Sequence, residues 1–160
     1  MTDEIKAAIG FLEQTPERLR RLLAGLSEPQ LRFRLRPDAF SIKETVLHLR
    51  DIEIEGYARR LRCILNEETP LLADIDGTQL ALDRRYNEQQ VAPALGEFAA
   101  SRMENVSLLR TITARDLMRT AEMEKVGRIS LAQLIEMWRE HDAGHWAEFE
   151  ELRRVVETIV

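Results

Sequence analysis

Histidine is rare in this chain, and its three copies have a spacing that suits metal binding. His141 and His145 lie four residues apart within Glu140–Trp146, whereas His48 is far away in the sequence. On a helix, residues four apart leave the same face one turn apart, so both imidazoles can reach one ion. Zinc, nickel and iron accept neutral imidazole, and three histidines plus water form an open catalytic arrangement. Whether His48 meets the pair therefore decides what chemistry is available.

Two interpretations of the His141–His145 pair are open on spacing alone. Both residues fall in the middle of an apolar stripe that runs through 131–158. They are either core histidines hydrogen-bonded to neighbouring side chains or ligands of a metal. The pair does not match the zinc-protease signature, because Ala143 and Gly144 occupy its interior in place of a helix-favouring pair beside a base. The pair lies on a stripe that is expected to be buried, and the remaining histidine, His48, lies on another helix whose apolar face is expected to point into the bundle. Together these features favour the metal site over core histidines.

Other groups that could do chemistry carry weaker signals. Glu44 and Asp51 lie about one turn on either side of His48, and they are either carboxylates that orient its ring or capping and surface residues. Cys63 is a single thiol with no histidine nearby in the sequence, which favours a packed or exposed cysteine over a nucleophile. The spacing identifies no catalytic acid, base or nucleophile.

Four long stretches with apolar residues at helical spacing must position the histidines. They cover about 3–26, 42–66, 91–113 and 131–158. Ser41 and Ser130 each begin a capping box, in which Ser is followed three residues later by Glu or Gln, at the start of the second and fourth stretches. Pro16 is expected to kink the first helix or to begin a second helix there.

The segments between these stretches complete the predicted architecture. Residues 67–90 are expected to form a long crossover connection with a short helix near 79–86, and 27–30 to form one helical turn. Residues 115–128 are expected to be a charged loop, and no segment alternates clearly enough to predict a strand. The sequence therefore predicts an all-α fold, a four-helix bundle with a long crossover connection and one or two short extra helices, as one domain over 1–160.

Composition excludes several classes of protein. The chain has 160 residues, enough to bury a sizeable core in one domain. Its formal net charge of −5 argues against a partner that is a nucleic acid. Charged residues recur every few positions, so no apolar run predicts a membrane span. One cysteine and an acidic N-terminus without a signal sequence predict a cytoplasmic protein.

The chain resembles the DinB-like family, also called the DinB/YfiT-like metalloenzymes, over nearly its whole length. The matching segments are Leu12–Pro16, Leu22–Ser27, Phe40–Glu44, Val46–Glu53, Gly127–Leu131 and His141–His145. Phe40 stands where the family usually has Trp, which is a packing change. The resemblance implies a four-helix bundle in which His48, His141 and His145 bind a divalent metal at one end of the bundle. It also implies a homodimer. Members of the family include thiol-dependent S-transferases and isomerases.

The predicted function is that of a metal-dependent enzyme, a thiol-dependent S-transferase or a hydrolase. Its expected cofactor is a divalent metal, zinc, nickel or iron, that lowers the pKa of bound water or thiol. Its expected partners are a small-molecule substrate, a low-molecular-weight thiol and a second copy of the chain. The alternative hypothesis is a non-catalytic, stress-related module that binds a small molecule or a protein. Sequence alone does not separate them, because fold and metal carry over within a family better than the reaction does.

Overall fold

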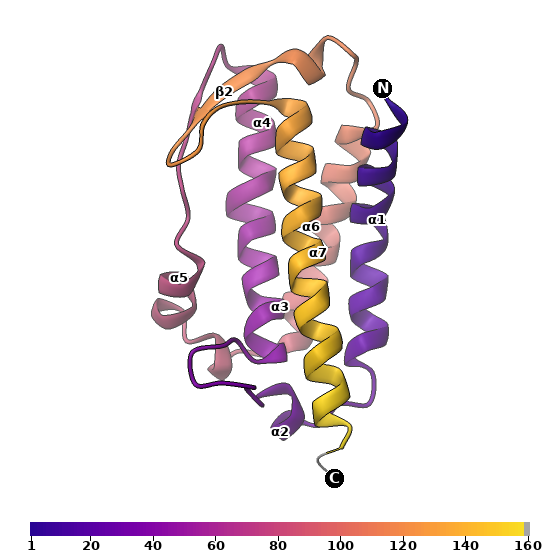
Figure 1. The fold of residues 1–160 in the computed structure, drawn as a ribbon, viewed down its shortest axis with the longest axis vertical. Helices are drawn as coiled ribbons and strands as arrows, with labels where there is room; N and C mark the ends of the chain where they lie inside the picture. The colour runs from indigo at the N-terminus through magenta and orange to yellow at the C-terminus, as the bar shows by residue number, and fades with distance from the viewer. Residues whose placement is uncertain (159–160) are drawn as a thin grey trace.

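The computed structural model describes residues 1–158. Four long helical segments lie side by side and form a four-helix bundle, as predicted (Figure 1). They are α1 (Asp3–Leu23), the continuous segment α3 (Ile42–Asp51), η1 (Ile52–Tyr57) and α4 (Ala58–Asn66), then α6 (Val91–Leu109) and α7 (Leu131–Val156). None of the helices in the described part of the chain is long and apolar enough to cross a membrane.

The first helix runs without interruption through its proline. Thr2 caps α1, and the helix continues past Pro16 to Leu23, so the second helix considered at this position does not begin there. Pro16 has no backbone N–H and cannot bond the carbonyl of Leu12, four residues earlier. Nη1 of Arg102 donates to that carbonyl at 3.0 Å. A side chain from another helix thus supplies the hydrogen bond that the proline removes.

The second helical segment contains a turn that its sequence pattern does not reveal. Ser41 and Glu44 form the predicted capping box at its start, and the helix ends at Asn66 as expected. Between α3 and α4 the segment Ile52–Tyr57 is a π-helix. A π turn accommodates an extra residue within a helix, and such turns are frequent at functional sites. This one carries Glu53 into the bundle, where it is fully buried.

The connection from α4 to α6 crosses from one end of the bundle to the other (Figure 1). As a result, α6 runs in the same direction as α3 and α4. The short helices of the fold are α2 (Glu28–Leu31), α5 (Gly77–Asp83), η2 (Tyr86–Glu88) and η3 (Asp116–Met118). The predicted helix at 79–86 is therefore found slightly earlier, as α5. Asp51 at the end of α3 fixes the connection, because its Oδ2 accepts from the hydroxyl of Tyr86 at 2.6 Å and from Arg84 at 2.7 Å.

A small sheet closes one end of the bundle, and its strands were not predicted. β1 (Leu71–Leu72) pairs in parallel with β2 (Thr120–Met123), which pairs antiparallel with β3 (Gly127–Ser130). The expected loop at 115–128 is therefore wrong at 120–123 and 127–128, which are strands. Strands of two to four residues are too short to establish an alternating pattern. Gly127, at φ +92°, faces Met123 across the hairpin, in a conformation that favours glycine.

The core has two large apolar clusters with buried polar residues between them, and a smaller third cluster of Leu47, Ala81, Tyr86 and Ala94. On α7, apolar residues of the cluster near the sheet reach Trp138, and those of the second cluster begin at Phe149. On α1 and α6 the two large clusters are likewise separated, by Thr15 on α1 and by Arg102 and Asn105 on α6. The buried polar residues in this layer are Thr15, Asp51, Glu53, Arg102, Asn105 and Asp142. His48 lies about one turn before Asp51 and His141 directly precedes Asp142, so the histidines adjoin this layer.

Candidate metal centre

The structure brings the three histidines together from two helices. His48 projects from α3, and His141 and His145 project from successive turns of α7. The Nε2 atoms of His48 and His141 are 3.2 Å apart, and one nitrogen from each ring lies within 4.8 Å of the others. All three pairs of ring centroids are 4.7–5.3 Å apart. The helical spacing thus positions the pair as expected, and the contact with His48 depends on how α3 and α7 pack.

The arrangement fits a transition metal. Two nitrogens that bind one zinc ion at tetrahedral angles, each at 2.0–2.1 Å, are separated by about 3.3 Å. The Nε2 atoms of His48 and His141 match that separation. A hydrogen bond between those two rings would account for their contact but not for the approach of His145. A shared metal would account for the close approach of all three rings. Metal binding stays a prediction for these residues.

Burial favours the neutral form of His48 and His141, the form that binds a metal. His48 is only 8% exposed, and its burial, reinforced by His145 and His141, lowers its pKa to about 3. Burial also lowers the pKa of His141, although the adjacent Asp142 opposes the effect. Neutral imidazole is the metal-binding species, so no proton has to be displaced from His48 at neutral pH.

Two carboxylates on α7 lie beside the ligand rings. Oε2 of Glu148 is 2.8 Å from Nδ1 of His145, and that hydrogen bond lowers the pKa of Glu148. Oδ1 of Asp142 is 3.6 Å from Nδ1 of His141, too far for a hydrogen bond. Carboxylates in these positions fix the tautomer and orientation of a metal-binding imidazole, leaving Nε2 for the metal.

His48 is held between an aromatic ring and a glycine. The ring of Phe40 lies 5.5 Å from that of His48, centroid to centroid. On another side, the backbone at Gly77 approaches so closely that a Cβ there would lie 2.7 Å from Nδ1 of His48. Only glycine fits this position without displacing something. The sequence pattern did not single out Gly77, because the contact joins residues 29 positions apart.

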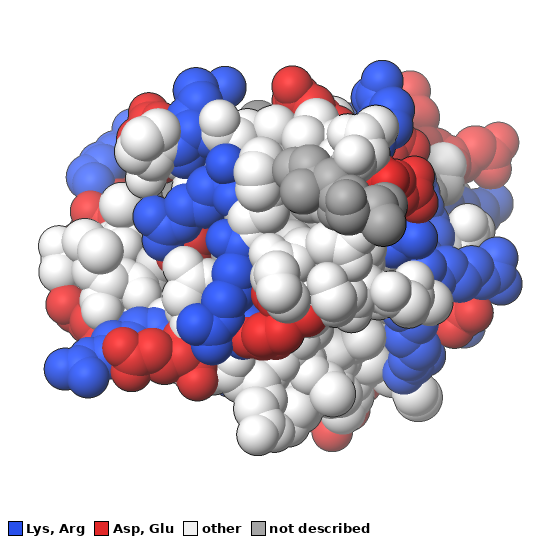
Figure 2. Space-filling model, turned by 90° about the horizontal axis from the view of Figure 1, so that it is seen from below, with Lys and Arg blue, Asp and Glu red and all other residues white. Residues whose placement is uncertain are grey.

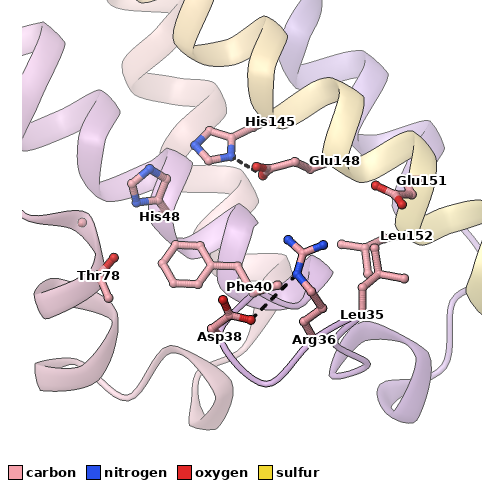
Figure 3. Close-up of a pocket in the computed structure, with 12 residues that line it drawn as sticks. Leu35, Arg36, Asp38, Phe40, His48, Thr78, His145, Glu148, Glu151 and Leu152 are labelled. Atoms are coloured by element: carbon pink, nitrogen blue, oxygen red, sulfur yellow. Dashed lines mark hydrogen bonds and ion pairs between the residues drawn. The ribbon is translucent and has the colours of Figure 1, made fainter.

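A cavity of about 420 Å³ gives access to the candidate site (Figure 3). His48 and His145 form part of its wall, and the side chains of Phe40, Arg36 and Glu148 point into the same region. The other lining residues are Leu35, Asp38, Ala39, Gly77, Thr78, Glu151 and Leu152. At the α2 end of the molecule, basic and acidic side chains are interspersed rather than separated by sign (Figure 2).

Glu44 and Asp51, which the sequence suggested as partners of His48, make their hydrogen bonds to other residues. Glu44 accepts from the backbone N–H of Ser41 at 2.9 Å and pairs with Arg34, which confirms its capping role. Asp51 holds the crossover connection. Both carboxylates are buried rather than at the surface. Cys63 does not line the cavity, and burial raises the pKa of its thiol, in agreement with an ordinary cysteine rather than a nucleophile.

A buried polar network next to His141 was missed at the sequence level. Arg102 donates to Glu53 through Nε at 2.9 Å and to Asp142 through Nη1 at 2.7 Å. Glu53 also accepts from the amide of Asn105 at 2.8 Å and the indole of Trp138 at 3.1 Å. Arg102 lies among apolar residues of α6 at core spacing. An arginine at such a position is the one signal that could have indicated the network, since charged side chains are buried only when paired.

The chain is similar to proteins named as metal-dependent hydrolases. Residues 12–149 match the family model described as the DinB superfamily. A protein of Oceanobacillus iheyensis is 26% identical over 144 residues, which cover 90% of this chain and 83% of that protein. A protein of Bacillus licheniformis is 38% identical over 73 residues, which cover 46% of this chain and 41% of that protein. Both proteins are named as metal-dependent hydrolases, a function assigned to them by inference.

The fold matches a solved structure along nearly its whole length. The neighbour is YfiT from Bacillus subtilis, described as a probable metal-dependent hydrolase with an unusual four-helix bundle topology. The TM-score is 0.89, and the match covers 98% of this chain and 90% of that one. The sequences are 23% identical, so this likeness supports the fold alone.

Proposed function

This chain belongs to the DinB superfamily, and we propose that it is a metal-dependent hydrolase whose metal is held by His48, His141 and His145. The observation that carries the proposal is the convergence of three imidazoles, of which His48 and His145 line a cavity and His48 and His141 have depressed pKa values. The names of the relatives support the same class of reaction.

The residues of the site have separate tasks. The three histidines supply neutral nitrogen ligands, and Glu148 orients His145 by accepting from its Nδ1. Phe40 and Gly77 pack against His48 and restrict its ring. A divalent metal bound to three histidines acts as a Lewis acid and lowers the pKa of water. Three histidine ligands would leave room for substrate and water, which could reach the metal from the cavity that His48 and His145 line.

The cavity fits a small-molecule substrate. Its volume of about 420 Å³ lies within the ~300–1,000 Å³ range of small-ligand pockets. Apolar side chains such as Leu35 and Leu152 and polar side chains such as Arg36 and Thr78 both line it. The substrate is therefore expected to combine an apolar part with polar groups.

The test combines metal analysis with turnover. Purified protein is reconstituted with zinc, nickel or iron and assayed on a panel of esters and amides, with and without a chelator. We expect about one metal per chain and hydrolysis that chelation abolishes and metal restores. His141→Ala should lose both, whereas Cys63→Ala, which changes a residue outside the cavity, should retain both. Less than stoichiometric metal in the reconstituted wild type would contradict the proposal.

The same assay addresses the other hypotheses. Turnover that requires an added low-molecular-weight thiol would indicate S-transfer instead of hydrolysis. Stoichiometric metal without turnover on either panel would favour the binding module. The homodimer stays a prediction, which light scattering of the reconstituted protein would check.

A further inference from the structure

Two buried carboxylates share one guanidinium in the centre of the bundle. Nη2 of Arg102 is 2.7 Å from Oε2 of Glu53, and its Nη1 is 2.7 Å from Oδ2 of Asp142. All three side chains are at most 1% exposed. Burial raises the pKa of Glu53, whereas its ion pair with Arg102 favours the ionised carboxylate; with both carboxylates ionised, the trio carries one negative charge in excess. Such a charge is costly in a desolvated interior unless a cation compensates it.

The two carboxylates differ in how fully they are hydrogen-bonded. Both oxygens of Glu53 have partners, because Asn105 donates to one and Arg102 and Trp138 donate to the other. Oδ1 of Asp142 has none among the described residues. It faces Nδ1 of His141 across 3.6 Å, and that nitrogen is likewise buried without a partner in the described chain. The unused acceptor of the trio therefore points at a ligand of the candidate metal.

We infer that Asp142 is a positioning residue for His141, and that the excess charge of the Glu53–Arg102–Asp142 trio favours a divalent cation at the three histidines. The inference rests on the proposed metal site. In the loaded protein, Nδ1–H of His141 donates to Oδ1 of Asp142, which requires a shift of a few tenths of an ångström. That bond keeps Nε2 free to bind the metal and makes it more basic.

The surroundings of Asp142 make it more effective than the other carboxylate beside the site. Glu148 already forms a hydrogen bond with His145, but its side chain is 60% exposed, so the surrounding solvent screens its charge. Asp142 is buried, so its charge acts on the site through a medium of low dielectric constant. Arg102 also donates a hydrogen bond to the carbonyl of Leu12, which ties the trio to α1 as well as to η1, α6 and α7. The carboxylate is thus held in place before any metal binds.

Zinc affinity of variants tests the inference. Asp142→Asn keeps the shape of the side chain and removes its charge, and Glu53→Gln removes the same excess charge without touching His141. Tyr57→Phe is the matched control, because it removes a partly buried hydrogen bond to the carbonyl of Met137, near His141, without changing any charge. Zinc dissociation constants are measured by competition with a chromophoric chelator, on protein shown by circular dichroism to be folded.

We expect Asp142→Asn to weaken zinc binding about 10- to 100-fold, the usual effect of removing such a partner. Glu53→Gln should weaken it less, and Tyr57→Phe should leave it unchanged. If Asp142→Asn does not fold, the difference between Glu53→Gln and Tyr57→Phe decides. Zinc affinity equal to the wild type in both charge variants, or a loss no larger than in Tyr57→Phe, would overturn the inference while leaving the metal site intact. Absence of zinc binding by the wild type would overturn the proposed function and this inference together.

Discussion

Replacing Gly77 by alanine should damage the candidate site although it adds only one methyl group. The backbone of Gly77 is not in the left-handed region, so alanine can adopt its conformation. The added Cβ would nevertheless lie 2.7 Å from Nδ1 of His48, closer than van der Waals contact allows. The His48 ring cannot retreat freely, because it packs against Phe40 and against both other histidines. Either the ring or α5 has to move.

The size of the effect follows from two opposing contributions. Replacing glycine by alanine in an unstrained conformation stabilises a protein by about 0.4–1 kcal/mol, through the unfolded chain. Inserting a carbon into a packed interior costs about 1–3 kcal/mol. The net expectation for Gly77→Ala is a loss of about 1–2 kcal/mol in the free energy of unfolding. If the ring moves, the zinc affinity should also fall, by about tenfold or more.

Gly144→Ala is the matched control for this substitution. Gly144 lies on α7 between two of the histidines, but a Cβ there would meet nothing within 4 Å. This variant should be more stable than the wild type by roughly 0.5–1 kcal/mol, the difference between alanine and glycine within a helix. Urea denaturation of the metal-free proteins measures both changes, and chelator competition measures zinc affinity. A Gly77→Ala protein as stable as Gly144→Ala, with the zinc affinity of the wild type, would refute the reasoning.

Three further predictions concern charge. Arg102→Met should lower the free energy of unfolding by about 3–5 kcal/mol in urea denaturation, because it leaves Glu53 and Asp142 buried without their cation; a loss below 1 kcal/mol would contradict this. The metal-free protein should lose stability as the pH falls from 6.5 towards 5, since unfolded His48 takes up a proton that the folded form, with a pKa of about 3, does not. This histidine changes the free energy of unfolding by at most about 1.4 kcal/mol per pH unit, and not at all above its unfolded pKa. A His48→Gln variant whose stability falls with pH as steeply as that of the wild type would refute the assignment. Glu148→Gln should weaken zinc binding less than Asp142→Asn does, because Glu148 is exposed; a larger loss in the same titration would reverse their order.

The bundle could be predicted because its signals are local. Apolar residues at helical spacing and the capping boxes at Ser41 and Ser130 determine where the long helices lie, and both capping boxes are present. The His141–His145 pair could be placed on one helix face for the same reason. The approach of His48 is a tertiary contact over 93 residues, and helical periodicity could make it plausible but could not establish it.

The features that were missed depend on contacts between distant segments. The strands are stabilised by pairing between 71–72 and 120–130, which no pattern within four residues reveals. Glu53 and Arg102 lie among apolar residues of their helices, and their burial is explained by partners on other helices, which include each other and Asp142. Gly77 lies in a segment predicted to be a connection, where glycine is unremarkable. Its role becomes visible only from its closeness to His48.

Anomalous X-ray diffraction from crystals of the zinc-reconstituted protein, recorded on both sides of the zinc absorption edge, tests the central claim most directly. We expect one zinc peak per chain between His48, His141 and His145, with Nε2 atoms about 2.0–2.1 Å from it. Full zinc occupancy elsewhere on the chain, or no peak between these three rings in protein that contains stoichiometric zinc, would contradict the account.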